Sequence, residues 1–416
     1  MPIQTEMDAA GPDFYRILSD FVLEGTEKHT ILQKVELDGR PIPLYVNEFW
    51  TAKQRQASSI QEISYRACFK PQLPRFFIER LTGLGDVVHD PFGGRGTTAI
   101  EAGLLGRRVI SNDINPLSEI LTRPRLEVPM LTDVAARLGD IEFDTGARPD
   151  RDLTMFYHSD TLDEIVSLRE YLRGRRDDGS EDASDRWIRM VATNRLTGHS
   201  PGFFSVYTLP PNQATSPNRQ MKINRTRGQK PEYRDVKELI LRKSRGLLRT
   251  LSDAGRRNLR ECARTAEFFT EDSRRTPAIR AGSVQLTVTS PPFLDIVHYS
   301  QDNWLRCWFN GIDDAAVSER MTMSHTVEDW ERVMGETFYE LYRVTKPGGW
   351  VAFEVGEVRK GKIRLEERVV PLGLDAGFGC EAIVINSQRF TKTSNIWGVG
   401  NNRCGTNTNR IVLMRK

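Results

Sequence analysis

The stretch DPFGGRGTTAIEAG, residues 90–103, decides the fold of this 416-residue chain. The residues before it, GDVVHD at 85–90, have the apolar pattern of a buried strand, and TTAIEAGLLG at 97–106 has the apolar spacing of a helix. Glycines at such a turn let the backbone approach a ligand closely, and the helix N-terminus offers unpaired N–H groups to an anion. The pattern predicts a nucleotide-like ligand, although tight strand-to-helix turns also use glycine for steric reasons alone.

An acidic residue follows at the tip of the next predicted strand. Residues 107–116, RRVISNDINP, run from basic to apolar to acidic, and Asp113 lies 23 residues after Asp90. In dinucleotide and adenosyl sites, an acid about 20 residues past the glycine turn accepts hydrogen bonds from ribose hydroxyls. Asp113 can also cap the helix predicted to follow it, and the two roles are compatible.

A second chemical signal lies at residues 281–299, AGSVQLTVTSPPFLDIVHY. VQLTVT alternates as a strand does, and the prolines of TSPPF end it in a stiff corner. The corner projects the Ser290 hydroxyl, carbonyls near Pro291 and the Phe293 ring at a strand's carboxyl end, where open α/β sheets bind ligands. Acceptors beside an aromatic face suit a planar base with an exocyclic amino group. Alone, the stretch also fits a strand-ending turn with a packed phenylalanine.

Composition sets the outer bounds. With 38% hydrophobic residues, the chain can bury a sizeable core and is expected to form one large domain with an elaboration, or two domains. No stretch approaches the length of a membrane span and the first residues lack a signal-peptide core, so a cytoplasmic protein without membrane contact is expected. The five cysteines are scattered and the six histidines dispersed, so no disulfide and no metal are expected.

The net charge of +3 is unevenly distributed along the chain. Residues 173–264 hold 21 Lys and Arg against 10 Asp and Glu, which gives this part a net charge of +11. Such a stretch is typical of a polyanion partner, because phosphate neutralisation dominates nucleic-acid affinity, but a solvated helix face produces the same charge run.

In combination, these motifs resemble those of the amino-group DNA methyltransferases, which use S-adenosylmethionine to methylate cytosine N4 or adenine N6. FKPQLPRFFIERL at 69–81 resembles the family's N-terminal helix motif, and FFTEDSRR at 268–275 its strand that ends in an acid near the cofactor's adenine. LYRVTKPGGWVAFEVG at 341–356 is similar to the family's helix, Gly-Gly turn and fifth strand, and CEAIVINSQRF and TNRIVLMRK are similar to its closing strands.

The resemblance implies a class I methyltransferase fold, which is a Rossmann-like, doubly wound, mostly parallel seven-stranded α/β sheet, here with a largely helical insertion. Residues 65–150 and 265–416 would form the methyltransferase domain, and residues 1–64 an N-terminal extension. Residues 151–264 would form the basic insertion and recognise the DNA target.

Roles for single residues follow from the same resemblance. The residues implied to bind S-adenosylmethionine are Pro71, Asp90, Phe92, Gly93, Gly94, Gly96, Thr97, Thr98, Asp113 and Asp272. The residues implied to hold a flipped base are Ser290, Pro291, Pro292 and Phe293. In this family the exocyclic nitrogen attacks the sulfonium methyl directly, a reaction that depends on alignment of nucleophile and methyl and on acceptors for the amino protons.

The insertion is long, because 154 residues separate Asp113 from the next predicted strand at Glu267, where a strand–helix–strand unit needs roughly 30 or more. It contains helical patterns at 162–173 and 234–257, and a polar loop at 205–229 rich in Asn, Gln, Arg and Pro. Asn, Gln and Arg suit base edges, and Lys and Arg suit phosphates. The residues expected to contact double-stranded DNA are Arg219, Lys222, Arg225, Arg227 and Lys230.

Within the family, serine before Pro-Pro is commoner in cytosine-N4 enzymes and Asp or Asn in adenine-N6 enzymes, so Ser290 favours cytosine N4. The alternatives are an adenine-N6 enzyme, an RNA or protein amino-group methyltransferase, and a non-catalytic nucleic-acid-binding relative. The resemblance also suggests a restriction-modification setting, with a cognate restriction endonuclease as partner, and a location at the nucleoid.

Overall fold

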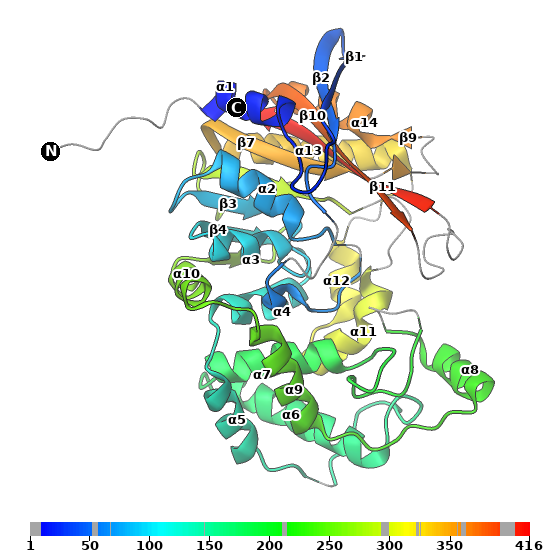
Figure 1. The fold of residues 1–416 in the computed structure, drawn as a ribbon. Coiled ribbons are helices and arrows are strands. Elements are labelled where there is room, and N and C mark those ends of the chain that lie inside the picture. The colour runs from blue at the N-terminus through cyan, green and yellow to red at the C-terminus, as the bar shows by residue number, and fades with distance from the viewer. Residues whose placement is uncertain are drawn as a thin grey trace, which may run out of the picture.

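A large sheet forms the centre of the molecule in the computed structural model. The structure describes residues 10–51, 57–66, 68–144, 146–209, 214–292, 299–321, 324, 326–355, 357–358, 363–391 and 404–416. The strands are β1 (Ile31–Leu37), β2 (Arg40–Asn47), β3 (Val87–Asp90), β4 (Arg108–Asn112), β5 (Glu267–Phe269), β6 (Val284–Thr289), β7 (Thr345–Val355), β8 (Glu357–Val358), β9 (Ile363–Arg364), β10 (Gly379–Thr391) and β11 (Cys404–Arg415). Except for the separate β8–β9 pair, they form one sheet in the order β1-β2-β10-β11-β7-β6-β3-β4-β5 (Figure 1).

Seven of these strands have the expected class I methyltransferase topology. From β5 to β7 all neighbours run parallel, and β11 is antiparallel to both β7 and β10. VQLTVT forms β6 with the bounds expected, and the glycine turn joins β3 to a helix. The fold class predicted from the sequence is therefore confirmed.

The strand number differs from the prediction, because the sheet has nine strands rather than seven. The hairpin β1–β2 comes from the N-terminal extension, and β2 pairs in parallel with β10 from Leu44 opposite Ile383 to Asn47 opposite Asn386. An uncovered β10 would leave a row of backbone donors and acceptors unpaired, and β2 satisfies them. The extension carries no recognisable motif, so this long-range pairing was not foreseen.

Helices cover both faces of the sheet. The helices on one face are α1 (Ala10–Ser19), α2 (Gln72–Leu81), α3 (Thr97–Leu104), α4 (Leu117–Leu126) and α10 (Asp253–Ala263), and those on the other are α13 (Val327–Val344) and α14 (Leu365–Asp375). Strand β7 shows the two-sided burial, because Trp350 and Ala352 join the first core while Val351 and Phe353 join the second. The run from Trp350 to Phe353 is apolar at every position, as strands buried on both faces are.

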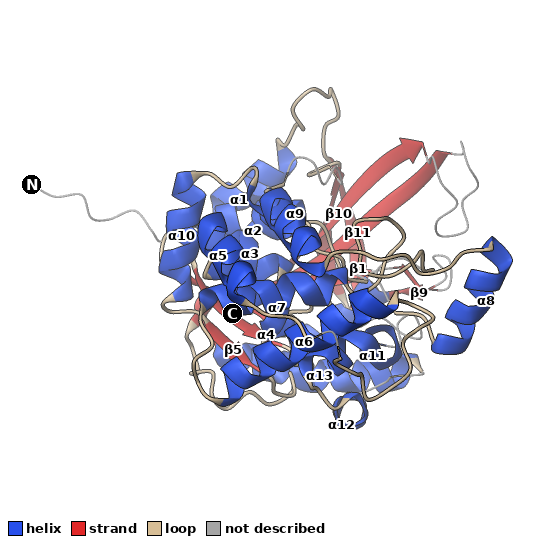
Figure 2. Cartoon of the chain, turned by 90° about the horizontal axis from the view of Figure 1, so that it is seen from below, coloured by secondary structure: helices blue, strands red, loops and turns tan. Residues whose placement is uncertain are grey.

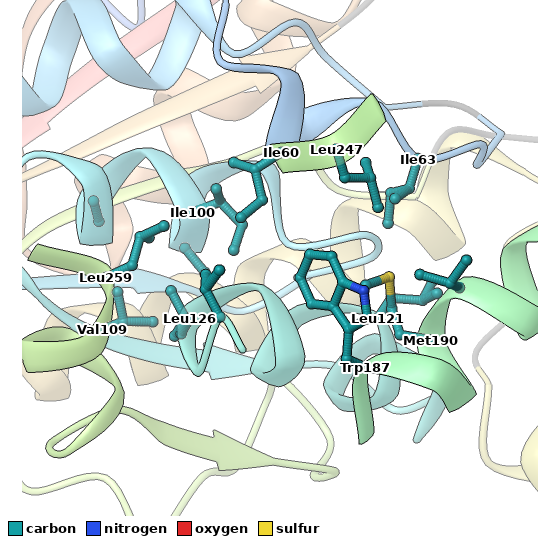
Figure 3. Packing of buried hydrophobic residues seen from close by; sticks show 14 of the residues in the cluster. Ile60, Ile63, Ile100, Val109, Leu121, Leu126, Trp187, Met190, Leu247 and Leu259 are labelled. Atoms are coloured by element: carbon teal, nitrogen blue, oxygen red, sulfur yellow. The ribbon is translucent and has the colours of Figure 1, made fainter. Parts of the chain in front are cut away.

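The insertion is helical and packs against the first face. Besides α10, its helices are α6 (Ser159–Asp177), α7 (Ala183–Arg195), α8 (Pro217–Arg227) and α9 (Val236–Leu248), and they lie near α5 (Leu131–Asp140), α11 (Tyr299–Asn310) and α12 (Asp314–Arg320) (Figures 1 and 2). Figure 3 shows that Trp187 and Met190 of α7 and Leu247 of α9 lie in the same cluster as Leu121 of α4 and Ile100 of α3. One apolar core therefore runs from the sheet into the insertion.

The polar loop expected at residues 205–229 contains a helix instead. Helix α8 starts after Ser216, whose side chain accepts from the Arg219 amide, has Pro217 at its first position, and ends at Gly228 in the left-handed conformation. These are ordinary helix start and stop signals, and the Asn, Gln, Arg and Pro composition concealed them. Within the ranges that the structure describes, no helix is long and apolar enough to cross a bilayer.

The bend that starts α3 predicts a large effect of one methyl group. Gly96 has φ +74°, and a Cβ there would lie 2.2 Å from Thr122 Oγ1 on α4. Gly96→Ala should lower the free energy of unfolding by about 2–4 kcal/mol, as the sum of left-handed strain and overpacking. Chemical denaturation followed by circular dichroism measures this loss.

Two controls separate the two causes. Gly85 has φ +76° and open space where a Cβ would project, with nothing within 4 Å, so Gly85→Ala should show the backbone strain alone, about 1–2 kcal/mol. Adding Thr122→Ala to Gly96→Ala should recover the packing part. Equal losses for Gly85→Ala and Gly96→Ala would contradict the packing account.

Candidate functional site

One pocket lies at the carboxyl ends of β3, β4, β5 and β6 and is lined by both chemical motifs. Nine of the residues predicted to bind a cofactor or a base line it: Asp90, Phe92, Gly93, Gly94, Thr97, Asp113, Asp272, Ser290 and Pro292. Segments far apart in the sequence meet here because the strands that precede them are neighbours in the sheet. Open α/β sheets bind ligands at this edge.

A direct hydrogen bond joins the glycine loop to the serine-proline corner. The Thr289 hydroxyl at the end of β6 donates to Asp90 Oδ1 at the end of β3, at 2.6 Å. The Thr98 hydroxyl at the start of α3 donates to the Val288 carbonyl oxygen at 3.0 Å. Burial raises the pKa of Asp90 to about 6, against the opposing effect of the hydrogen bonds that it accepts. The two corners are therefore parts of one rigid unit.

Asp113 closes the glycine loop as well as lining the pocket. Its Oδ2 accepts from the Gly94 amide at 2.7 Å and its Oδ1 from the Asn115 amide at 2.9 Å. Gly93 is packed against β4, since a Cβ there would lie 2.6 Å from Ser111 Oγ. Burial raises the pKa of Asp113, and the two amides oppose that shift. The predicted helix-capping role is wrong, because the N-cap of α4 is Pro116 and has no side-chain cap hydrogen bond. Asp113 instead stabilises the turn before that helix, and each carboxylate oxygen keeps a lone pair for a ligand.

The end of β5 brings two carboxylates to the pocket, of which only Asp272 was predicted. Arg274 donates to both Asp272 oxygens and is the main cause of the lowered pKa of Asp272. Glu271 also lines the pocket, and its Oε2 is buried without a hydrogen-bond partner among the described residues. The buried Asn115 Nδ2 is in the same situation. Both atoms are ready to bind a polar ligand.

The serine-proline corner rests on two residues that carry no sequence signal. Trp330 of α13 is 2% exposed, lines the pocket and donates its indole N–H to the Pro292 carbonyl oxygen at 3.0 Å. Glu354 of β7 is buried, and its carboxylate is hydrogen-bonded by Ser290 and by Asn409 Nδ2. Burial is the main cause that raises the Glu354 pKa. In the sequence, Glu354 lies within the apolar run WVAFEV, and Trp330 lies in the charged stretch VEDWERV, so neither position signals a role in a site.

A short segment before the motifs, residues 60–65, is held over the glycine loop by cations. Arg95 from the loop itself donates to the Ile63 carbonyl oxygen at 2.9 Å, and the ammonium of Lys243 on α9 donates to that of Glu62. Burial lowers the pKa of Lys243 to about 8. Tyr65 at the end of the segment lines the pocket. The insertion thereby contributes to the position of a pocket wall.

Of the residues that the structure describes, the others predicted to bind cofactor, base or DNA do not line this pocket. Pro71 and Pro291 are buried outside the pocket lining, Gly96 packs against Thr122, and Phe293 lies outside the described residues. The five basic residues expected to contact DNA are all exposed and lie on or just after α8: Arg219, Lys222, Arg225, Arg227 and Lys230. The pocket residues that the sequence did not reveal include Tyr65, Arg320, Met321, Val333 and Met334.

The raised pKa of Asp90 predicts a pH dependence of stability with a definite sign. The folded state holds the Asp90 proton more tightly than the unfolded state, so ionisation costs stability as the pH rises from about 4 to about 6, and the cost is complete above about 6. Asp90→Asn lacks this cost. Its stability relative to the parent should therefore increase across that interval and be constant on either side, as measured by urea denaturation at a series of pH values.

Asp272 provides a control of opposite sign. Its pKa is lowered, so its ionised form stabilises the folded state above the unfolded pKa of about 4, and this contribution is lost as the pH falls. Asp272→Asn should lose stability relative to the parent as the pH rises. A difference for Asp90→Asn that stays flat with pH would contradict the account of Asp90.

Comparison with known proteins agrees with this arrangement. Residues 27–120 match the family model for DNA methylases of the N6/N4 type. The chain is 35% identical over 63 residues to type II methyltransferase M.MjaII of Methanocaldococcus jannaschii, covering 15% of this chain and 12% of that protein. It is 24% identical over 308 residues to type II methyltransferase M.BsoBI of Geobacillus stearothermophilus, covering 64% and 56%. The chain thus spans about half or less of the length of these curated relatives.

Solved structures of methyltransferases are also similar. A protein of Thermus thermophilus described as a DNA modification methylase is 21% identical, with a TM-score of 0.21 over 35% of this chain and 50% of that one. A SAM-dependent methyltransferase of Methanosarcina mazei is 11% identical, with a TM-score of 0.31 over 82% and 96%. The family match over residues 27–120 and the curated relatives agree with the strand order, the glycine loop and the serine-proline corner: this chain is similar to the amino-group DNA methyltransferases.

Proposed function

We propose that this chain transfers a methyl group from S-adenosylmethionine to the exocyclic N4 of cytosine in double-stranded DNA. The main support for the proposal is the hydrogen bond from Thr289 to Asp90, which holds the glycine loop and the Ser290 corner side by side as two walls of one pocket. A donor site and an acceptor site for a group transfer must be adjacent in this way, since the rate depends on the alignment of the reacting atoms.

The polar groups of the pocket fit S-adenosylmethionine. Gly93 and Gly94 offer bare backbone, and Asp113 offers acceptors for ribose hydroxyls. Asp272 and the unpartnered oxygen of Glu271 would take the adenine amino group or the ribose, beside Asn115. Thr97 would lie near the methionine carboxylate at the start of α3, where helix N–H groups favour an anion. When bound, the cofactor supplies an electrophilic methyl group.

The serine-proline corner would hold the base. Because the Ser290 hydroxyl donates to the Glu354 carboxylate, its oxygen lone pairs are left to accept a proton of the base's amino group. Trp330 fixes the Pro292 carbonyl and so the backbone of the corner. Acceptors that bind the amino protons stabilise the positive charge that develops on the amine nitrogen as it attacks the methyl group. Because these acceptors are already in place, they need no rearrangement during the reaction. The base would enter the pocket by flipping out of the duplex, as it does in other enzymes that modify bases in DNA.

The basic insertion is the proposed contact with DNA. We assign residues 65–150 and 265–416 to the catalytic part, residues 151–264 to target recognition, and residues 1–64 to an N-terminal extension that completes the sheet. The relatives named type II methyltransferases support a role in restriction-modification beside a cognate endonuclease, and hence an association with the nucleoid.

The decisive test measures the product. The purified chain with tritiated S-adenosylmethionine and duplex DNA should yield N4-methylcytosine in the digested nucleosides. Ser290→Ala should lower kcat by about 100-fold to 1000-fold, the effect of removing one oriented partner in a site, and leave the Kd for the cofactor within about twofold. Recovery of N6-methyladenine alone would overturn the assignment of the base, and transfer only to RNA or protein would overturn the assignment of DNA.

Trp330→Phe tests the support of the corner. Loss of the bond to Pro292 should lower kcat by about tenfold, equivalent to one neutral hydrogen bond, with little change in the KM for S-adenosylmethionine. Trp187→Phe is the matched control, because Trp187 donates its indole N–H to Ser244 at 3.0 Å in the core of the insertion. Equal losses of kcat in the two variants, or a loss confined to Trp187→Phe, would refute the role of Trp330.

A further inference from the structure

Helix α8 differs from the other helices of the insertion in how it is held. In both views it lies at the outer edge of the molecule, away from the packed helices (Figures 1 and 2). Of its residues, Gln220 alone is buried. We propose that α8 lies in a groove of the DNA duplex and reads the bases next to the methylated one. This inference rests on the proposed function and names the element that selects the substrate.

One face of α8 is anchored by amide side chains. Gln220 and Gln229 both donate to the Tyr207 carbonyl oxygen, at 3.1 and 3.0 Å, and to Asn224 Oδ1, at 2.8 Å each. Asn224 in turn donates to the Met155 carbonyl oxygen at 2.8 Å. These bonds orient the helix without an apolar contact area of the usual size. Such an anchor fixes which face of α8 looks outward.

Arg227 belongs to the anchor and not to the outward face. Its guanidinium carbon lies 3.9 Å from the centre of the Tyr207 ring, which favours a cation. Gly228 then ends the helix in the left-handed conformation, with its amide on the Arg225 carbonyl. Of the five basic residues expected to contact DNA, Arg227 is thereby assigned a positioning role.

The opposite face presents positive charge to solvent. Arg219, Lys222 and Arg225 are exposed, and α8 contains no acidic residue. Among the residues that the structure describes, none of these three cations forms an ion pair, whereas most arginines of α6 and α7 are paired with carboxylates. Asn218 is the exposed amide of α8 beside these cations, and a helix with exposed arginine, lysine and asparagine side chains matches the major groove in width and in chemistry.

The start of α8 lies close to the proposed methyl-transfer pocket. Ser216, Pro217 and Arg219 line a groove together with Asp314 and Ser318 of α12. The last residue of α12, Arg320, lines the pocket itself. Helix α12 has seven residues and is therefore about 10 Å long, less than the width of the major groove. Duplex bases next to a flipped nucleotide would lie within reach of the first turn of α8.

The test removes the outward charges of α8. The variant Arg219→Ala/Lys222→Ala/Arg225→Ala is compared with Lys34→Ala/Arg257→Ala/Arg280→Ala, which removes three cations on β1, on α10 and before β6. Binding of a labelled duplex in the presence of S-adenosylhomocysteine is measured by fluorescence anisotropy between about 50 and about 200 mM salt. Cofactor binding is measured separately by calorimetry.

The α8 variant should bind DNA at least about 100-fold more weakly, and the slope of log K against log salt should fall by about 2 to 3, while its cofactor affinity is unchanged. The control variant should bind DNA within about threefold of the parent. Parental DNA affinity in the α8 variant, or an equal loss in the control, would overturn the assignment of α8. If the parent chain itself neither binds nor methylates DNA, the proposed function fails instead.

Discussion

The structure depends on one constraint: the carboxyl ends of the parallel strands β3 and β6 lie side by side. The hydrogen bond from Thr289 to Asp90 holds these two ends together. A glycine loop alone is a common turn, and a serine-proline corner alone is a common strand ending. Placed side by side, they create a pocket with bare backbone on one wall and oriented acceptors on the other. The remaining features, from the position of α13 to the helical insertion, support the walls of this pocket.

Support comes from polar contacts as much as from apolar packing. Segment 60–65 is held through its carbonyl oxygens by cations from the glycine loop and from α9, and Trp330 holds the corner from α13. Arg125 of α4 donates to the Leu121 and Ile60 carbonyl oxygens, and Lys243 donates to that of Glu62. Because these buried cations are held by carbonyl oxygens rather than carboxylates, burial lowers the pKa of Arg125 to about 9 and that of Lys243 to about 8. A buried charge held only by dipoles is sensitive to any change in its surroundings.

Local chemistry made much of the fold predictable. Alternation located β6, the glycine turn located β3 and α3, and the spacing of Asp113 located the end of β4. In each case neighbouring residues determine the conformation. The pocket was predicted where these elements end, because parallel strands bring their carboxyl ends to one edge.

Long-range partners were not predictable in the same way. Hairpin β1–β2 joins the sheet through pairing with β10, a strand near the other end of the chain, and the sequence around Glu354 and Trp330 does not signal that the fold brings them to the corner. Arg274 donates to both carboxylate oxygens of Asp272, and no spacing in the sequence indicates this ion pair. Helix α8 was missed for a different reason, since a helix anchored by amides lacks the apolar periodicity that identifies most helices.

The shared core of sheet and insertion limits how specificity can change in evolution. Trp187, Met190 and Leu247 pack in one cluster with residues of α3 and α4 that cover the sheet, so replacing the whole insertion would require many of these neighbours to repack (Figure 3). Helix α8 lies at the edge of the molecule and is held by a few hydrogen bonds of side-chain amides, so substitutions on its outer face require little repacking. Under the proposed role of α8 in reading DNA, new target sequences would arise by substitutions in this peripheral helix while the packed interior is conserved.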